Sequence, residues 1–386
     1  MEDPESREGL PPIAEAADEV SGMGKEQLAA APLASRRGFL IGAGTTAVVP
    51  TAAALLGGPL VSIAHATATT GGSPGFAPVP KASLGPPVNQ DGYYVGHIAG
   101  NLYWVTDSIY ISMFLSTAEG VIVVDAPPTI GQNLLRAISA VTQVTGRSAK
   151  VTHFIYSHSH GDHNGAASIF GRDVVRIGHV QCRDLLVRDN DPHRPPPDVT
   201  FEDNYTLTVG GERLELNYHG PNHSPDNIFI YAPAYHTLML VDVVFPGWVP
   251  FKDLAVSQDI PDWIAAHEIA MRYPWKTLVA GHLGRLGTRR DVEVQQAYIS
   301  DLLTQARVTM ASLNPTALFE KYGNNAWAIF RVYLNEASAQ IAAPVTKKYL
   351  DTLGGADVFT TDNAFTIFEF SLREDGGVLG PFGIHP

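Results

Sequence analysis

The sequence has a single cysteine, Cys182, among 386 residues. One cysteine excludes a framework of intramolecular disulfides, and it leaves no thiolate cluster of the kind that structural zinc sites commonly use. Long basic runs are absent too, and the formal net charge of −13 argues against a nucleic-acid partner held through its phosphates. The sequence does contain 45% hydrophobic residues, which is enough for the core of a large globular protein.

An unbroken apolar run long enough for a permanent membrane helix is also missing. The apolar stretch that follows Arg36 and Arg37 is interrupted by Pro50 and Pro59, whereas a membrane helix needs about 20 apolar residues with fewer breaks. Paired arginines before such a stretch resemble a twin-arginine export signal. We therefore expect residues 1–66 to be a signal peptide that is recognised by the twin-arginine export machinery, and the mature protein to be periplasmic or secreted.

The limits of this leader follow from short sequence patterns. Ala64-His65-Ala66 fits the small-x-small pattern of a cleavage site, so the mature chain is expected to begin near Thr67. Translation from Met23 instead of Met1 would give a shorter leader, and an N-terminal anchor or a buried helix is the alternative to a leader. Residues 67–92 are rich in Gly, Pro, Thr and Ser, which predicts an extended linker or a strap lying on the domain.

Three histidines and an aspartate lie within six residues, directly after the apolar run 151–156. The motif is His158-Ser-His160-Gly-Asp162-His163. Alternation along an extended strand end would place His158 and His160 on one side, and a turn at Gly161 would bring Asp162 and His163 round to face them. Imidazole and carboxylate are ligands of Zn²⁺, with some tolerance for Fe, Mn or Co. The motif indicates an open, catalytic site for two metal ions, the alternative being a polar turn with chance histidines.

This motif resembles the HxHxDH signature of the metallo-β-lactamase superfamily, and three later segments resemble the rest of that pattern. They occur in the expected order as Gly220-Pro-Asn-His223, Leu240-Val-Asp242 and Val279-Ala-Gly281-His282, and the resemblance covers roughly residues 93–290. It implies that His158, His160 and His223 bind one metal, that Asp162, His163 and His282 bind the other, and that Asp242 bridges them. Taken singly, each later residue also fits a loop histidine or a strand-end aspartate.

Strand and helix patterns alternate along residues 93–290, in two halves of similar content. This alternation fits an α+β protein with the four-layer αβ/βα sandwich of the metallo-β-lactamase type, whose site lies on loops at one sheet edge. The predicted strands cover 103–106, 110–116, 121–125, 151–156, 173–177, 205–209, 213–218, 228–231, 237–241 and 277–280. The predicted helices of this core cover 133–144, 180–187 and 260–273.

Beyond residue 290 the pattern is mainly helical. Periodicity predicts helices over 291–313, 325–334 and 337–350, with a break in the last at Pro344. Alternation over 365–370 predicts a closing strand. We therefore expect residues 291–386 to be a C-terminal helical extension packed on the core.

The resemblance implies a metal-dependent hydrolase that uses a metal-bound hydroxide. Two divalent ions, zinc in the first place and Mn or Fe as alternatives, lower the pKa of a shared water, and Asp162 is expected both to bind metal and to orient the hydroxide. Lactonases and glyoxalase II-type thioesterases share the full ligand set, which favours a small-molecule carboxylic ester or lactone as substrate. The alternatives are a β-lactamase or phosphotriesterase-like hydrolase, an iron-dependent redox enzyme of the same fold, and a metal-binding protein without catalysis.

Candidates for the substrate pocket come from residues next to the expected ligands. Phe245, Trp248 and Phe251 follow Asp242 and would form an apolar wall, unless they seal the core. Arg285 lies just past His282 and would bind a substrate carboxylate, unless it is a solvated charge at a helix start. Many lactonases place a tyrosine three residues after the bridging aspartate, where this sequence has Phe245. The sequence does not indicate an oligomeric state.

Overall fold

The computed structural model describes residues 75–378 and residue 380. The expected signal peptide, residues 1–66, lies outside the described residues, as do the first residues of the expected linker. No described helix combines the length and the apolarity that crossing a bilayer requires.

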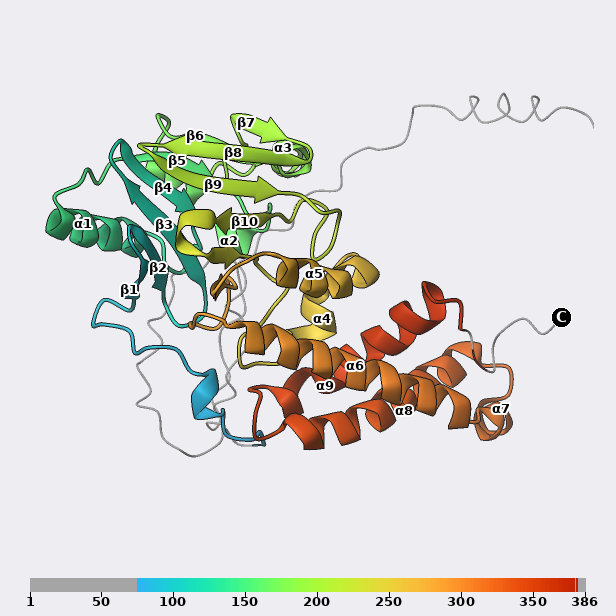
Figure 1. Ribbon diagram of the computed structural model, residues 1–386. Coiled ribbons are helices and arrows are strands. Elements are labelled where there is room, and N and C mark those ends of the chain that lie inside the picture. The colour runs from blue at the N-terminus through green and yellow to red at the C-terminus, as the bar shows by residue number, and fades with distance from the viewer. Residues whose placement is uncertain (1–74, 379, 381–386) are drawn as a thin grey trace, which may run out of the picture. The chain divides into compact units, whose positions relative to one another are not determined.

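The described core holds two mixed β-sheets (Figure 1). The first has seven strands, in the order β1 (Tyr94–Ala99), β2 (Leu102–Thr106), β3 (Ile111–Thr117), β4 (Gly120–Val124), β5 (Val151–Ile155), β6 (Val175–His179) and β7 (Val199–Phe201). The second has five strands, in the order β12 (Thr277–Val279), β11 (Thr237–Met239), β10 (Phe229–Ala232), β9 (Glu212–Asn217) and β8 (Asn204–Val209). Every predicted core strand is present with shifted ends, and β1 and β7 were not predicted.

Three apolar clusters hold the layers together. Ile122 of the first sheet and Ile230 of the second belong to one buried cluster, so the two sheets pack face to face. A second cluster joins the first sheet to α1 (Asn133–Thr145) and α3 (Val180–Asp189) through residues such as Ile138 and Leu186. A third joins the second sheet to α5 (Ile260–Arg272) through Trp263. These contacts confirm the predicted four-layer αβ/βα sandwich.

The connections between strands decide where a site can form. The β8–β9 hairpin turns at Gly210 and Gly211, whose φ angles of 54° and 81° suit the two-residue hairpin turn that favours glycine. By contrast, β4, β5 and β6 pair in parallel. Their carboxyl ends therefore lie at one edge of the sheet, and the segments that follow Val124 and Ile155 meet there.

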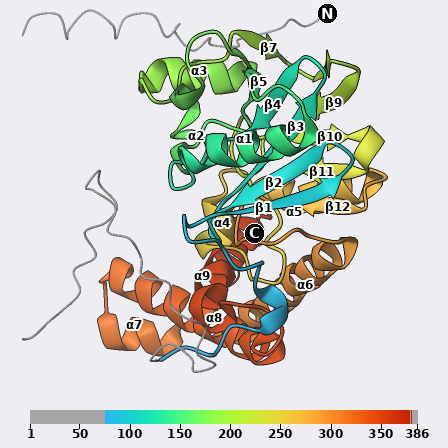
Figure 2. The same cartoon turned by 90° about the vertical axis from the view of Figure 1, so that its left-hand side faces the viewer.

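The C-terminal extension is helical and packs on the outer helical layer of the second sheet (Figure 2). It consists of α6 (Arg289–Ser312), α7 (Thr316–Tyr322), α8 (Ala326–Tyr349), α9 (Ala356–Thr366) and the π-helical segment η4 (Ile367–Glu374). Thr288 and Asp291 form a reciprocal capping box that starts α6. Buried side chains of all these helices share the third cluster with Trp263.

Two predictions for the extension were wrong. The two helices predicted over 325–334 and 337–350 are one helix, α8, which continues through Pro344 because Ile341 and Val345 pack in the core on either side of it. The strand predicted over 365–370 is the end of α9 and the start of η4. A short apolar run can alternate by chance, and here the burial of Ile367, Phe368 and Leu372 on one helical face decides the structure. Helix α7 was not predicted.

The described part of the Pro/Gly-rich segment lies on the domain as a strap. Its one helical turn, η1 (Lys81–Ser83), buries Ser83, whose Oγ donates to the carbonyl of Gly247 at 2.5 Å. The indole of Trp248 donates back to the carbonyl of Ser83 at 3.0 Å. Nearer the N-terminus, the Ala77 N–H donates to Asp357 of α9 at 2.6 Å. The strap thus joins the turn at Gly247 to the C-terminal extension.

Candidate metal centre

The histidine motif follows β5 and is fixed by hydrogen bonds to its backbone. After Ile155 the chain bends over residues 157–159 and reaches His160, whose backbone is extended and which is the N-cap residue of a short helix, α2 (Gly161–Asn164). The predicted turn at Gly161 is therefore the start of a helical turn. The side chain of Asn164 donates to the carbonyl of His158 at 2.8 Å, and Arg194 donates to the carbonyl of Ser159 at 2.7 Å. These contacts hold the loop from two sides.

The structure brings all the predicted ligand residues together. They form two adjoining clusters, in each of which the candidate ligand atoms lie within 4.8 Å of one another: His158, His160, His223 and Asp242 in the first, and Asp162, His163 and His282 in the second. Asp242 lies between them, because its Oδ1 is 2.8 Å from His282 Nε2 and its Oδ2 is 3.1 Å from His223 Nε2. This grouping is the one implied by the sequence.

Asp242 is held in an unusual backbone conformation at the end of β11. Its φ angle is 62°, in the left-handed region that residues other than glycine rarely adopt. The Trp263 indole of α5 donates to the carbonyl of Asp242 at 2.9 Å, and the Asn227 side chain donates to that of Val241 at 2.9 Å. Strained residues of this kind persist where the surroundings over-determine them, which is typical of functional sites.

The charges at the centre are strongly coupled. Burial alone would raise the pKa of Asp242, but the imidazoles of His163, His223 and His282 outweigh it and hold that pKa well below its usual range. Burial also lowers the pKa of His158 well below its usual value, with the neighbouring His160 adding to the effect. For His163 burial opposes protonation, yet Asp242 and the other nearby carboxylates raise its pKa to about 9. Asp242 therefore places a carboxylate anion between the two groups of imidazoles.

The buried nitrogen and oxygen atoms of the two clusters are better satisfied by metal ions than by hydrogen bonds to one another. The buried His158 Nε2 has no hydrogen-bond partner among the described residues, and Asp242 Oδ1 lies 2.8 Å from His282 Nε2 without forming a hydrogen bond. A buried polar atom without a partner is costly, and a divalent cation would satisfy both atoms at once. Five imidazoles and two carboxylates in two adjoining groups match the ligands of open zinc sites and of two-metal sites. The arrangement is thus consistent with a dinuclear centre.

Asp125, at the end of β4, holds the backbone next to His158 in place. Sequence analysis did not predict this role. It is fully buried, and its Oδ1 accepts the Ser157 N–H at 2.8 Å. Burial raises its pKa to about 6, against the opposing charge of His163. Its sequence signal was a lone aspartate after an apolar strand, which does not distinguish such a role from an ordinary strand end.

The clusters form part of the wall of a cavity of about 400 Å³, a size common for small-molecule sites. The structure brings the predicted aromatic residues Phe245, Trp248 and Phe251 to this cavity. Phe245 also stacks against His282, with ring centroids 5.8 Å apart. The full lining is Tyr110, His160, Asp162, His223, Asp242, Phe245, Trp248, Val249, Phe251, Ala255, Val256, His282, Leu283, Gly354, Gly355, Val358 and Phe359.

Tyr110 is a cavity residue that sequence reasoning missed. It precedes β3, and its ring centroid lies 4.8 Å from that of His282 and 5.5 Å from that of His163. Burial raises the pKa of its hydroxyl to about 12, with the carboxylates of Asp162 and Asp242 adding to the effect. No motif marks this residue, because a bridge between Tyr110 and His282 brings together segments that are distant in sequence.

Arg285 does not reach the cavity, contrary to the role considered for it. Its Nη2 pairs with Asp291 Oδ1 at 2.6 Å, and its Nη1 donates to the Leu286 carbonyl at 3.0 Å. Because Asp291 belongs to the capping box of α6, Arg285 stabilises the start of that helix instead of binding a substrate carboxylate.

Comparisons with known proteins agree with this geometry. The profile of the metallo-beta-lactamase superfamily matches residues 105–282. The 2,4-dinitroanisole O-demethylase subunit alpha of Nocardioides sp. (strain JS1661) is 27% identical over 200 residues, which are 51% of this chain and 59% of that protein. The metallo-beta-lactamase type 2 of Elizabethkingia meningoseptica is 27% identical over 177 residues, which are 44% of this chain and 68% of that protein.

A solved structure, a metallo-beta-lactamase from Pontibacter korlensis, aligns with a TM-score of 0.45 and 23% identity over 53% of this chain and 97% of that chain. Of the demethylase subunit named above, the chain spans 59% of the length. The profile match includes the HxHxDH motif, Asp242 and His282, and these residues converge on one centre. Residues 105–282 thus match the metallo-β-lactamase superfamily, and this part of the chain carries a His/Asp metal-binding cluster.

Proposed function

We propose that this protein hydrolyses a small carboxylic ester or lactone. One observation carries the proposal: the two His/Asp clusters form part of the wall of a cavity of about 400 Å³ whose other walls are mainly aromatic and aliphatic side chains. Such a cavity offers polar groups at the reacting bond and apolar contacts for the rest of a substrate.

The residues that would hold the metals are those of the two clusters, with Asp242 shared between them. When bound, two divalent ions supply a water molecule of lowered pKa and a Lewis acid that polarises the substrate carbonyl. We take zinc as the first candidate, because the ligands are imidazoles and carboxylates. The ring stacking of Phe245 on His282 and the hydrogen bonds to the motif loop keep these donors in place.

Asp162 and Tyr110 are the cavity residues that would handle protons and charge. The Asp162 side chain is 43% exposed and its Oδ2 lies 3.5 Å from His163 Nε2, so it faces both the centre and the cavity. It would orient the attacking water and accept its proton. The Tyr110 hydroxyl interacts with Asp162 and would donate a hydrogen bond to the carbonyl oxygen as negative charge develops there.

The reaction needs no covalent intermediate with the protein. The water oxygen adds to the carbonyl carbon, and the bond from that carbon to the alcohol oxygen then breaks. The proton accepted by Asp162 is passed to the departing alcohol oxygen. The products are a carboxylic acid and an alcohol, or a hydroxy acid where the substrate is a lactone.

A second candidate is cleavage of an alkyl aryl ether. One relative is named as a 2,4-dinitroanisole O-demethylase subunit and is 27% identical over 200 residues. The cavity lining includes five aromatic residues besides the histidines, Tyr110, Phe245, Trp248, Phe251 and Phe359, and these would suit a substrate ring. A β-lactam, a phosphotriester and an iron-dependent oxidation remain the other candidates.

A single screen separates these functions. The metal content of protein purified from its native host is measured first, because Zn or Mn supports hydrolysis and Fe supports oxygen chemistry. The same protein is then assayed on lactones, aryl esters, thioesters, β-lactams, phosphotriesters and nitroanisoles. Turnover of esters or lactones at least tenfold faster than of the other classes supports the proposal. Preferred turnover of another class, or an iron centre that consumes oxygen, would overturn it.

We also propose that the enzyme acts outside the cytoplasm. The support is the Arg36-Arg37 pair before an apolar segment and the Ala64-His65-Ala66 pattern. The full chain and an Arg36→Lys/Arg37→Lys double variant would be expressed in a bacterium with a twin-arginine pathway and then fractionated. A processed protein in the periplasm that is lost in the double variant supports export. Unprocessed cytoplasmic protein in both cases would contradict it.

A further inference from the structure

We propose that helix α9 of the C-terminal extension, together with the α4 turn (Lys252–Val256), builds a subsite for an uncharged apolar substituent of the substrate. An alkyl chain of several carbons or an aromatic ring fits this description. The proposal rests on the proposed function, because it assumes that the reacting bond lies at the metal clusters while the substituent extends away from them.

The first wall of the subsite comes directly from α9. Val358 and Phe359 line the cavity, and the Phe359 ring contacts the Phe251 ring edge-on with centroids 5.0 Å apart. Both rings are apolar, and Val358 is 37% exposed, which places it at the rim. The extension therefore provides one side of the cavity as well as covering the outer layer of the core.

The segment before α9 lets Trp248 form a second wall. A Cβ atom on Gly354 would come within 2.4 Å of the Trp248 ring, so only glycine allows this approach. Backbone bonds fix the pair, because Gly354 N–H donates to the Gly247 carbonyl at 2.9 Å and Val249 N–H donates to the Gly354 carbonyl at 3.1 Å. The indole of Trp248 is in turn tied to the strap at Ser83.

The third wall is the α4 turn, which α9 holds in a rare conformation. Asp253, Leu254, Ala255 and Val256 have φ angles of 54°, 52°, 65° and 48°, a left-handed turn that residues with side chains seldom form. This turn directs Ala255 and Val256 to the cavity. Four consecutive residues in this region need support from neighbouring elements.

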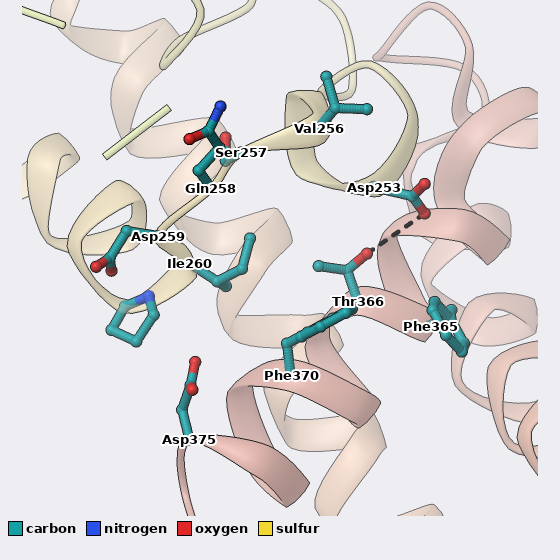
Figure 3. Close-up of a pocket in the computed structure, with 11 residues that line it drawn as sticks. Asp253, Val256, Ser257, Gln258, Asp259, Ile260, Phe365, Thr366, Phe370 and Asp375 are labelled. Carbon is teal, nitrogen blue, oxygen red and sulfur yellow. Dashed lines mark hydrogen bonds between the residues drawn. The ribbon is translucent and has the colours of Figure 1, made fainter. Parts of the chain in front are cut away.

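That support comes from polar side chains of α9. Asn363 is fully buried, accepts the Leu254 N–H at 2.8 Å and donates to the Pro250 carbonyl at 3.0 Å. Thr366 contacts Asp253 at 3.4 Å, which is the dashed contact in Figure 3. The extension thus shapes the cavity through the α4 turn as well as through its own side chains.

The charge of the lining favours an uncharged substituent. Among the described lining residues the ionisable groups are Tyr110, three histidines of the clusters and the carboxylates of Asp162 and Asp242. No lysine or arginine of the described chain lines the cavity, and Arg285 is paired with Asp291. An anionic group on the substituent would lose hydration without gaining a cationic partner from the protein.

A second hollow, of about 550 Å³, shares Val256 with the cavity (Figure 3). Asp253, Asp259 and Asp375 contribute to its lining, and it contains none of the cluster residues. The α4 turn therefore contributes Val256 to both hollows.

The subsite is tested by a homologous series of ligands on the metal-loaded full chain. Binding of N-alkyl acetamides is measured by calorimetry, and kcat/KM is measured for 4-nitrophenyl esters from acetate to octanoate. Each methylene that enters the subsite should tighten binding about threefold to fourfold, until the cavity is filled. A terminal carboxylate on the longest chain should weaken binding at least tenfold.

The variant Val358→Trp should fill the subsite from its rim. It is expected to lower the ratio of kcat/KM for octanoate over acetate at least tenfold and to flatten the chain-length dependence of amide binding. Val308→Trp is the matched control, because Val308 is an exposed valine of α6 at 58% exposure that does not line the cavity. The control should keep the full chain-length dependence.

The outcomes separate the two proposals. Equal chain-length dependence in Val358→Trp and in the parent chain, or equal binding of the carboxylated ligand, would overturn the subsite. Chain-length-dependent amide binding without turnover of any ester or lactone would leave the subsite in place and overturn the proposed reaction. Phe359→Leu serves as a second variant where Val358→Trp fails to fold, and it should weaken binding of the longest amide about threefold.

Discussion

The side chain of Gln295 accepts a hydrogen bond from the backbone N–H of Phe245, at 2.9 Å. The same side chain donates to the carbonyl of Val243 at 2.6 Å, so one residue of α6 holds both ends of the segment that follows Asp242. All three residues are buried. The C-terminal extension therefore fixes a segment of the centre that lies outside its own sequence.

This relationship predicts that Gln295→Leu destabilises the fold by about 2–4 kcal/mol, because it leaves a buried donor and a buried acceptor without partners. The measurement is urea unfolding of the metal-free protein followed by circular dichroism. Gln296→Leu, a partly exposed neighbour on the same helix, is the control and should change stability by less than about 0.5 kcal/mol. Equal stability of the two variants would show that the Gln295 contacts do not stabilise the segment.

A second prediction concerns metal removal. His160→Ala should lose bound metal and nearly all hydrolysis, because its ring lies in the first cluster. Chelation of the parent protein should lower the melting temperature, since metal present at about 100 times its dissociation constant stabilises a fold by about 2.7 kcal/mol. Metal content is measured by elemental analysis and melting by calorimetry.

The control for metal removal is His219→Ala. His219 lies close to His223 in sequence, but its Nε2 faces the Tyr273 hydroxyl at 2.7 Å and it belongs to neither cluster. This variant should retain metal and activity. Full metal content in His160→Ala would contradict the assigned centre.

The sequence located the centre well because its chemistry is concentrated. Four of the ligand-type residues lie within six positions after an apolar strand, and a strand end constrains where they point. The later residues could be placed because His223, Asp242 and His282 follow in a known order. The layered core was predictable for a related reason, since period-two alternation and helical spacing report which faces are buried.

What the sequence could not provide are the features that depend on tertiary contacts between distant segments. Tyr110 and His282 meet only because an isolated bridge joins their segments, and no local pattern encodes that pairing. The run 365–370 alternates like a strand, yet packing against the core makes it helical. Arg285 has the charge that would suit a substrate carboxylate, but its partner is Asp291. In each case a tertiary contact decides between two locally acceptable structures.

A third prediction concerns acid stability and rests on His267. Its imidazole is fully buried, and burial lowers its pKa to about 4. Its Nδ1 lies 3.0 Å from the Trp263 carbonyl and its Nε2 lies 2.6 Å from Gln295 Nε2. The neutral ring can donate to the carbonyl and accept from the amide, whereas the protonated ring would place a second donor against that amide.

The direction of the pH dependence follows from the protonation of His267 in the unfolded and folded protein. The unfolded histidine takes up a proton near pH 6.5, while the folded one stays neutral down to about pH 4. The contribution of His267 to the free energy of unfolding is therefore present above pH 6.5. It is lost as the pH falls toward 4, by up to about 3 kcal/mol. The measurement is the free energy of urea unfolding of the chelator-treated protein as a function of pH. His267→Gln should lose less of this free energy than the parent protein as the pH falls. Identical pH profiles for the variant and the parent would contradict the prediction.

The last prediction separates substrate activation from metal binding. Tyr110 lines the cavity and contacts His282 through its ring, so Tyr110→Phe keeps the ring and removes only the hydroxyl. If that hydroxyl stabilises charge on the carbonyl oxygen, kcat should fall by roughly 100-fold, the lower end of the effect of one such donor. Metal content should stay at the parent level, and KM should change less than kcat. Tyr103→Phe, which removes a hydroxyl from a tyrosine stacked on Phe114 away from the cavity, should leave both constants unchanged. A loss of metal in Tyr110→Phe would make the hydroxyl part of the centre, and an unchanged kcat would remove it from the reaction.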